Sequence, residues 1–343
     1  MDKAGLYFHI PFCKNKCPYC DFFSTKYCES AARDYCALLQ NEIKKYTGAF
    51  DTVYFGGGTP SIIPPRLIGN ILNTARSQFE IDKNSEITIE CNPRENLKDA
   101  FLAYKSYGIN RVSIGMQSAV DKERFALGRS AGRSEVARTV ADANDCGIEN
   151  ISLDLMLGVP HQTLESLDES FDFIDKMKVQ HISAYMLKIE EGTNFFEMQE
   201  RLPLPSDDEV SEMYLKTVEV LGQLGFDQYE ISNFAKPGFE SRHNLKYWQL
   251  VPYLGIGKSA HSFWDGRRFY YDENFEIIDD GDGGTNEERI MLGLRLTKGV
   301  KKAIITKPFG HLVKLGLLRE TNERIALTPQ GMLVSNAVIN ELI

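Results

Sequence analysis

Short apolar runs rich in β-branched and aromatic residues recur along the first half of the chain, with amphipathic stretches between them. The apolar runs predict strands at residues 5–10, 52–55, 86–91, 111–115, 151–156 and 181–187. The amphipathic stretches predict helices at residues 31–46, 65–79, 97–107, 134–146 and 164–176. Strands that alternate with helices in this way indicate parallel β-α units, so we expect an α/β fold with six such units.

The second half of the chain departs from this alternation. Ser206 and Glu209 form a capping-box pattern at the start of a helix expected over 205–224, and residues 228–234 predict one further strand. After residue 286 the expected order is helix, helix, small hairpin and helix, which resembles a winged-helix module. The expected elements are helices at 287–296 and 307–315, strands at 317–320 and 324–328, and a final helix after Thr328-Pro329.

This pattern divides the chain into three parts. We expect a main domain at 1–225, a connecting region at 226–285 and a smaller C-terminal domain at 286–343. A winged-helix module often binds DNA, but this one is not notably basic, so we interpret it as a packing or partner domain.

Composition is that of an ordinary globular protein, with 43% hydrophobic and 25% charged residues in a chain of 343. The formal net charge of −9 argues against general nucleic-acid binding, which needs a basic surface. No apolar run is long enough to span a bilayer, and no signal peptide precedes the first strand. Together with an odd number of cysteines, seven, these features predict a location in the reducing cytoplasm.

Three cysteines near the N-terminus carry the most specific signal in the chain. Cys13, Cys17 and Cys20 stand in the run F-H-I-P-F-C-K-N-K-C-P-Y-C-D-F, with the spacing C-x3-C-x2-C. Three thiolates can hold three irons of a [4Fe–4S] cluster and leave the fourth iron open to a small molecule such as S-adenosylmethionine. The alternatives are a structural zinc site, which usually takes four protein ligands, or three unconnected thiols. The remaining four are expected to be small buried side chains: Cys28, Cys36, Cys91 and Cys146.

A glycine run follows the second predicted strand in G-G-G-T-P-S, residues 56–61. Glycines let the backbone approach a ligand closely, and exposed backbone groups can bind an ammonium group. A tight turn is the ordinary explanation of such a run. Because the run lies one β-α unit after the cysteine motif, however, it is a candidate for binding a ligand at that motif.

Polar residues also end successive predicted strands. Glu90 ends the third strand, Gln117 ends the fourth, and Asp154 lies in the fifth. A carboxylate among apolar residues is unfavourable unless it is paired, so salt bridges across the barrel are the structural alternative. Because the carboxyl ends of parallel strands meet at one edge, these residues can instead surround a ribose and a carboxylate. Arg129, in L-G-R-S-A-G, has the fork geometry that pairs with a carboxylate.

A second candidate site lies in R-H-N-L-K-Y-W, residues 242–248. His243 is a candidate axial ligand of haem, and the aromatic residues Tyr247 and Trp248 can face a porphyrin. The alternative is the start of a surface helix with Asn244 as its cap and Trp248 in the core. His261, in G-I-G-K-S-A-H-S-F, is an alternative haem ligand.

The cysteine motif resembles that of the radical-SAM superfamily. The residues on either side of the motif indicate which family within that superfamily the chain resembles. L-Y-F-H-I-P-F-C at 6–13 resembles the start of the oxygen-independent coproporphyrinogen III oxidase family. The oxidases carry an extra cysteine two residues after the third cluster cysteine, where this chain has Phe22. The run at 242–248 fits the H-N-x-x-Y-W motif of the HemW branch of that family, which comprises oxidase-like proteins proposed to be haem chaperones. The resemblance covers nearly the whole chain.

The resemblance implies a partial (β/α)6 radical-SAM barrel followed by a smaller winged-helix-like domain. It implies a [4Fe–4S] cluster on the three cysteines and haem as a further ligand. It also implies S-adenosylmethionine bound by Tyr7, Gly57, Gly58, Thr59, Glu90, Gln117, Arg129 and Asp154. His9 matches a residue that contacts S-adenosylmethionine or substrate in the oxidase. The implied partners are haem and haem-accepting proteins such as membrane cytochromes, and no residue is assigned a catalytic role.

Three functions stay open at this point. The first is a haem chaperone, and the second is a coproporphyrinogen III dehydrogenase that decarboxylates propionate side chains by radical chemistry. Phe22, the H-N-x-x-Y-W motif and the few residues before the first strand disfavour the dehydrogenase. The third is a radical-SAM enzyme with an unrelated substrate. Whether the chain forms a homodimer is also open.

Overall fold

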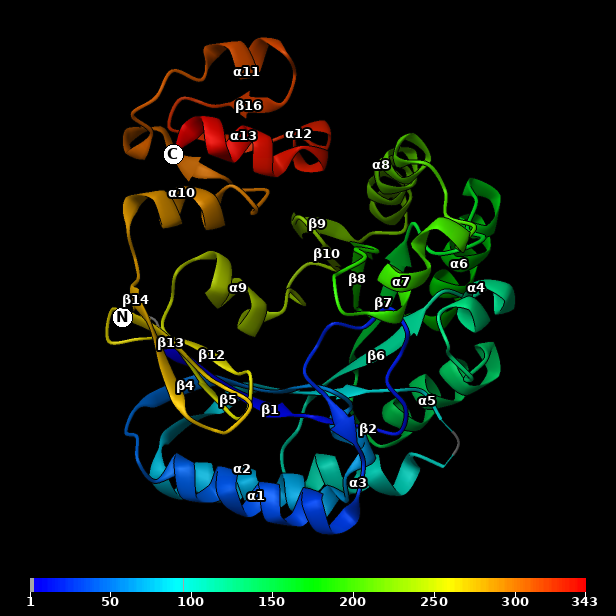
Figure 1. Cartoon of the computed structure of the whole chain (residues 1–343), viewed down its shortest axis with the longest axis vertical. Coiled ribbons are helices and arrows are strands. Elements are labelled where there is room, and N and C mark those ends of the chain that lie inside the picture. The colour runs from blue at the N-terminus through cyan, green and yellow to red at the C-terminus, as the bar shows by residue number, and fades with distance from the viewer. Residues whose placement is uncertain (1–2, 95) are drawn as a thin grey trace.

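The computed structural model describes residues 3–94 and 96–343. Six parallel strands, each paired with the next, form the centre of the molecule (Figure 1). They are β1 (Ala4–Ile10), β4 (Ala49–Gly57), β5 (Glu80–Cys91), β6 (Arg111–Gln117), β7 (Asn150–Leu157) and β8 (His181–Met186). All six predicted strands are therefore confirmed. The side chains of β1, β6 and β7 are buried almost without interruption, as expected for parallel strands with both faces covered, whereas the first half of β5 is largely exposed.

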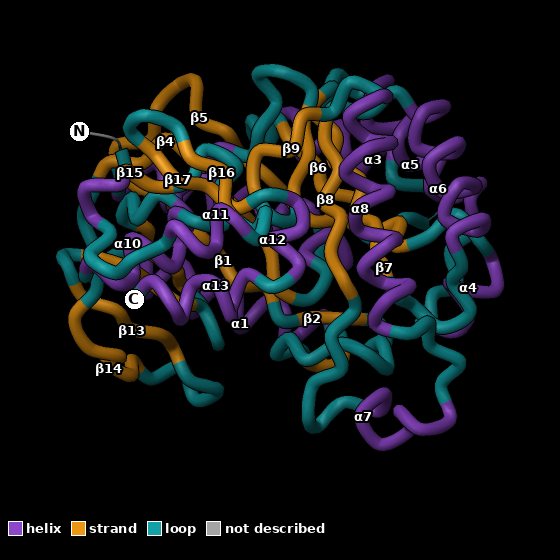
Figure 2. Tube along the Cα trace, turned by 90° about the horizontal axis from the view of Figure 1, so that it is seen from above, coloured by secondary structure: helices purple, strands orange, loops and turns teal. Residues whose placement is uncertain are grey.

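Helices connect these strands and cover the outer face of the sheet. Figure 2 shows α3, α5 and α6 along one side of the molecule. The helices are α1 (Glu29–Ile43), α2 (Pro65–Gln78), α3 (Lys98–Ser106), α4 (Asp121–Ala126), α5 (Arg133–Asp145), α6 (Leu164–Met177), α7 (Asn194–Met198) and α8 (Asp207–Gln223), with short 3-10 turns η1 (Pro60–Ile62) and η2 (Gln199–Arg201). The capping box that starts α8 is confirmed, because Ser206 and Glu209 each accept a hydrogen bond from the other's backbone N–H, at 3.3 and 2.7 Å.

The sheet continues beyond the six central strands on both sides. Its full order is β14-β13-β12-β11-β1-β4-β5-β6-β7-β8-β10-β9. The added strands are β9 (Asp227–Glu230), β10 (Asn233–Ala235), β11 (Tyr253–Ile256), β12 (His261–Trp264), β13 (Arg267–Tyr271) and β14 (Ile277–Asp282), and helix α9 (Arg242–Trp248) precedes β11. The region that we expected to connect two domains, 226–285, therefore adds strands to both ends of the main sheet.

One predicted strand is wrong. Residues 228–234 form two antiparallel strands, β9 and β10, rather than one. Ile231 and Ser232 turn the chain between them, and the Glu230 carboxylate accepts a hydrogen bond from the backbone N–H of Ser232 at 3.0 Å.

The C-terminal residues form a separate small sheet with helices around it (Figure 1). Its order is β15-β17-β16, and the strand β15 had no signal in the sequence. The elements are α10 (Asn286–Gly293), β15 (Val300–Lys301), η3 (Lys302–Ile304), α11 (Gly310–Lys314), β16 (Leu318–Glu320), β17 (Arg324–Leu327), α12 (Pro329–Leu333) and α13 (Ser335–Leu342). The expected helices and hairpin occur in the expected order, except that the single final helix is two helices, α12 and α13, which separate at Val334; the winged-helix assignment stays a prediction.

Contacts from α8 and from β9 fix the C-terminal unit to the main part of the molecule. The Tyr214 hydroxyl on α8 contacts the Met332 sulfur on α12 at 3.2 Å, and Glu230 at the end of β9 pairs with Leu296. Over residues 3–94 and 96–343, no helix is long and apolar enough to cross a membrane.

Candidate functional site: two joined cavities at the strand ends

A cavity of about 440 Å³ lies at the carboxyl ends of the central strands. Almost every site residue predicted from the sequence lines it: Cys13, Cys17, Cys20, Gly57, Gly58, Thr59, Glu90, Gln117, Arg129 and Asp154. The exceptions are Tyr7, which faces a second cavity, and His243, which lies behind that cavity. Parallel pairing aligns the strand ends, and this brings residues that are far apart in sequence to one place.

The three cysteines lie in a loop that two short strands close. β2 (Phe12–Cys13) pairs with β3 (Thr25–Lys26), and the backbone N–H of Cys20 bonds to the carbonyl of Cys17 at 3.1 Å. Burial raises the pKa of Cys20, and the neighbouring thiols of Cys17 and Cys13 add to that effect. Among the described residues no three Cys, His, Asp or Glu side chains converge on a single metal ion. In a [4Fe–4S] cluster each thiolate binds a different iron, so the three thiols need not converge on one point. Three cysteine thiols around one cavity therefore fit such a cluster.

The other four cysteines are not all buried. Cys36, Cys91 and Cys146 are buried as predicted, whereas Cys28 is exposed. The prediction is wrong there because Cys28 is the residue that precedes α1, where the chain enters the helix from the surface.

The glycine loop has no room for side chains. Gly57 has φ of +111°, and a Cβ there would lie 2.6 Å from the His9 ring. A Cβ on Gly58 would lie 2.8 Å from the carbonyl oxygen of Phe12 and 3.1 Å from the sulfur of Cys13. The Thr59 hydroxyl is 3.6 Å from the same sulfur. The loop therefore packs directly against the cysteine segment, and only glycine allows this approach.

Two half-buried carboxyl groups face the cavity, Glu90 from β5 and Asp154 from β7. Glu90 accepts hydrogen bonds from the Tyr54 hydroxyl at 2.9 Å and from the backbone N–H of Gly57 at 3.1 Å. Burial raises the pKa of Glu90 to about 7, and repulsion from Asp154 contributes. Burial likewise raises the pKa of Asp154 to about 6, although Ser113 donates a hydrogen bond to it at 3.0 Å. Within residues 3–94 and 96–343, neither carboxyl group forms the salt bridge that was the structural alternative.

Arg129 and Gln117 complete the wall of the first cavity. The Arg129 guanidinium donates to the hydroxyl of Tyr19 at 2.7 Å and to the side-chain oxygen of Asn92 at 2.7 Å. Gln117, with φ of +67°, accepts a hydrogen bond from the Tyr185 hydroxyl at 2.8 Å. The cavity thus offers a half-buried guanidinium, that of Arg129, which makes no ion pair with a carboxylate among the described residues.

Sequence reasoning missed several residues of this cavity. Asn92 stands two residues after Glu90, and Tyr19 stands between two cluster cysteines, so their positions in the motifs could have indicated them. Tyr54 and Tyr185 had no such signal, because an aromatic residue on a strand is most often part of the core.

A second cavity of about 960 Å³ adjoins the first and shares with it several lining residues, among them Phe22, Gly57 and Glu90. Tyr7 and His9 line it from β1, and the Tyr7 hydroxyl lies 3.2 Å from the His9 ring. The second cavity has an aromatic part, made by Tyr7, Phe22, Phe23, Tyr247, Trp248 and Tyr253, and a charged part, made by Lys16, Asp21, Glu90 and Glu273.

His243 lies behind this cavity and is fully buried. Its ring nitrogens are 2.8 Å from the Thr52 hydroxyl and 2.8 Å from the Tyr247 hydroxyl. Burial lowers the pKa of His243 to about 3. In this conformation both ring nitrogens are engaged in hydrogen bonds. His243 would have to break one of these bonds to ligate haem, and its role as a haem ligand stays a prediction.

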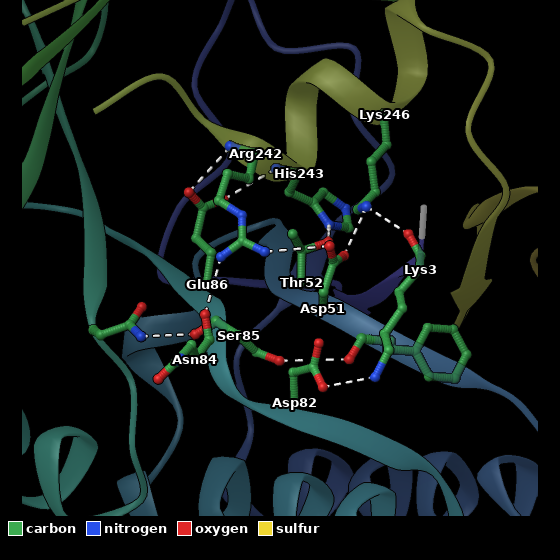
Figure 3. Close-up of polar contacts among 12 residues, drawn as sticks. Lys3, Asp51, Thr52, Asp82, Asn84, Ser85, Glu86, Arg242, His243 and Lys246 are labelled. Carbon is green, nitrogen blue, oxygen red and sulfur yellow. Dashed lines mark hydrogen bonds and ion pairs between the residues drawn. The ribbon is translucent and has the colours of Figure 1, made fainter. Parts of the chain in front are cut away.

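Figure 3 shows how α9 is held against the sheet. The Glu86 carboxylate accepts the backbone N–H groups of Arg242 and His243 at 3.1 and 3.0 Å. Asp51 pairs with the Lys246 ammonium at 2.7 Å. The helix is capped by Ser241, whose hydroxyl accepts from the N–H of Asn244, so the expectation that Asn244 is the cap is wrong.

Comparison with known proteins first defines the class. The profile of the Radical SAM superfamily matches residues 7–174. The chain also shares its fold with coproporphyrinogen III oxidase (HemN) from Escherichia coli, with a TM-score of 0.82, 20% identity, and coverage of 99% of this chain and 90% of that one. The structural match shows the shared fold, and the profile match identifies residues 7–174 as a radical-SAM domain.

Sequence relatives then define the family. The chain is 33% identical to "Heme chaperone HemW" of Bacillus subtilis (strain 168) over 97% of both chains. It is 30% identical to "Heme chaperone HemW" of Lactococcus lactis over 99% of this chain and 97% of that one. The mouse "Radical S-adenosyl methionine domain-containing protein 1, mitochondrial" is 35% identical over 95% of this chain and 72% of that one. The chain belongs to the HemW family.

Proposed function

We propose that this protein is a haem chaperone that binds haem and transfers it to acceptor proteins, while carrying a [4Fe–4S] cluster and S-adenosylmethionine. The observation that carries the proposal is the similarity to HemW proteins over almost the full length of the chain. The two joined cavities support it, because they provide separate space for the cofactors and for a flat apolar cargo.

The residues that would hold the cluster are Cys13, Cys17 and Cys20. Bound cluster and S-adenosylmethionine supply one-electron radical chemistry. The backbone of Gly57 and Gly58 and the Thr59 hydroxyl would bind the methionine ammonium, and Arg129 would pair with its carboxylate through two N–H groups. Glu90, Gln117 and Asp154 would accept hydrogen bonds from the ribose, and Tyr7 would contact the ligand from the neighbouring cavity.

The haem site in this proposal is the second cavity. Tyr247 and Trp248 of the H-N-x-x-Y-W segment line it, and His243 supports Tyr247 from behind. Membrane cytochromes are the proposed acceptors, and nucleic acid is not a proposed partner. The seven cysteines are free in the structure, which agrees with the proposed cytoplasmic location.

The alternative function is coproporphyrinogen III dehydrogenation. Phe22 argues against this activity, because it occupies the position at which the oxidases carry their additional cysteine. Its side chain is 65% exposed.

An anaerobic turnover assay separates the two functions. The reconstituted protein is incubated with coproporphyrinogen III, a reductant and S-adenosylmethionine, and the products are oxidised and separated as porphyrins. We expect no decarboxylated porphyrin. Substantial protoporphyrin would assign the protein to the oxidases and overturn the proposal.

A further inference from the structure

We propose that His261 is the axial ligand of haem in the second cavity, and that His243 is a positioning residue. This inference rests on the proposed function, because it takes haem as the cargo. It differs from the expectation drawn from the H-N-x-x-Y-W motif, which places the ligand at His243.

The first step concerns the shape and chemistry of the cavity. Its volume of about 960 Å³ is at the upper end of the range for small-molecule sites, which suits a macrocycle. Aromatic rings from β1, α9 and the loop after the cluster cysteines line it. Phe22 is 65% exposed at the junction of the two cavities, where a bound porphyrin would cover it.

The second step identifies the side chains that can ligate iron. Haem in proteins is ligated by imidazole, thiolate, thioether or phenolate groups. The tyrosines of the lining are engaged: Tyr7 bonds to His9, Tyr247 to His243, and Tyr253 accepts from Arg268 at 2.9 Å. Burial also raises the pKa of each of these phenols, which disfavours a phenolate.

The third step compares the histidines. His9 lines the cavity, but its nitrogens lie 3.2 Å from the Tyr7 hydroxyl and 3.1 Å from the Phe23 carbonyl. His261 lines the cavity as an exposed residue at its edge, and within the described ranges no group is hydrogen-bonded to its ring nitrogens. Among the described residues of this lining, His261 is the uncommitted imidazole.

The local structure presents the His261 ring rigidly. His261 is the first residue of β12, and it is paired in register with Tyr270 of β13. The two rings stack with centroids 5.0 Å apart and 26° between their planes. Desolvation lowers the pKa of His261, so the ring is neutral at neutral pH and can bind iron without releasing a proton. Lys16, on the rim shared by both cavities, offers an ammonium group to a propionate.

The geometry also gives His243 a different role. Its ring fixes the Tyr247 hydroxyl, and its backbone N–H is held by Glu86. Replacing His243 would therefore disturb the wall of the cavity without removing the bond to iron.

The test is haem titration of the cluster-reconstituted full chain, followed by the Soret band and by electron paramagnetic resonance of the ferric form. The His261→Ala variant should lose the imidazole-ligated signature and bind haem at least about tenfold more weakly, since even outer-shell substitutions cost about 10–100-fold in metal affinity. Added imidazole should restore the signature. The His243→Ala variant should keep the signature with weaker binding. His311→Ala, at an exposed histidine paired with Glu341 in the C-terminal unit, is the matched control.

The outcomes separate this inference from the proposed function. A wild-type protein that takes up no haem would overturn the proposed function and the inference together. A wild-type protein that binds haem, with an unchanged spectrum in His261→Ala, would overturn the inference alone. Loss of the signature in His243→Ala but not in His261→Ala would return the ligand to His243. Iron and sulfide contents equal to those of the wild type show that each variant is folded around its cluster.

Discussion

At the scale of single residues, the site is defined by groups whose ordinary chemistry is altered by burial. Glu90 and Asp154 are the clearest examples, because both carboxyl groups are half-buried and, among the described residues, neither has a charged partner in hydrogen-bond contact. Their raised pKa values mean that the protein folds more favourably when they are protonated.

This makes the stability of the cofactor-free protein depend on pH. The pKa of Glu90 is raised to about 7 in the folded state, so its stabilising contribution is complete below the unfolded pKa near 4.3 and is lost as the pH rises through about 7. Between pH 5 and pH 8.5 the Glu90 carboxyl should lower the free energy of unfolding of the wild type by up to about 3 kcal/mol. The Glu90→Gln variant should lack this decrease. Urea unfolding at several pH values measures the effect.

Glu80→Gln is the control for this experiment, because Glu80 is exposed and pairs only with Lys3 at the surface. Its pH dependence should match that of the wild type. A Glu90→Gln protein with an unaltered pH dependence would show that Glu90 is already ionised in the folded state.

The cysteines give the second prediction at this scale. Replacing Cys17 with Ala should remove most of the iron and the brown absorbance of the reconstituted protein, and Cys13→Ala and Cys20→Ala should do the same. Cys28→Ser, at an exposed thiol, and Cys36→Ala, at a buried one, should retain the cluster. Iron and sulfide analysis decides the matter, and a complete, stable cluster in Cys17→Ala would rule out the assignment.

At the scale of the elements, the site depends on segments that are packed against one another without spare space. The glycine loop after β4 is the best case, since a side chain on Gly57 would both strain the backbone and meet the His9 ring. Gly57→Val should therefore abolish the change that S-adenosylmethionine produces in the electron paramagnetic resonance spectrum of the reduced cluster.

The matched substitution is Gly222→Ala on α8, where nothing lies within 4 Å of the added Cβ. It should leave the spectral change intact. If Gly57→Val responds to S-adenosylmethionine like the wild type, the loop does not contact that ligand.

Helix α9 supplies a second prediction for an element. Glu86 binds the first two N–H groups of the helix, so Glu86→Gln should weaken charge-assisted bonds and lower the free energy of unfolding by about 1–3 kcal/mol. Chemical denaturation measures it. Asp82→Asn, at a surface ion pair with Lys3, should change stability by less than about 1 kcal/mol. Equal stability losses in the two variants would refute the idea that Glu86 holds α9.

How much could be predicted from the sequence differs between elements. The six central strands are predictable because each contains a run of mostly buried apolar residues between amphipathic helices, as β1, β6 and β7 show most clearly. The pairing of β11 with β1 is not, since hydrophobicity along the chain does not record a partner some 250 residues away. The same limit applies to the site: Cys13 and Glu90 stand in recognisable motifs, whereas Tyr185 reaches the cavity only because β8 lies beside β7.

At the scale of the whole molecule, one sheet joins the two cavities. Strands β4 to β8 position the residues that line the first cavity. On the other side of β1, strands β11 to β13 position His261 and its stacking partner Tyr270 at the second cavity. The segment 226–285 therefore provides one side of the proposed haem site, and this side lies outside the part of the chain that matches the superfamily profile, whereas Tyr7, Phe22 and other residues of the opposite side lie within it. This agrees with a general cofactor site in the shared fold and a family-specific cargo site beside it.

The central claim, that haem is the cargo of this protein, is tested most directly by measuring haem bound per chain in the cluster-reconstituted protein after removal of free haem. The proposed function predicts close to one haem per chain, with the cluster retained and with the Soret band of a ligated iron. A chain that carries its full cluster, responds to S-adenosylmethionine and yet retains no haem would contradict it.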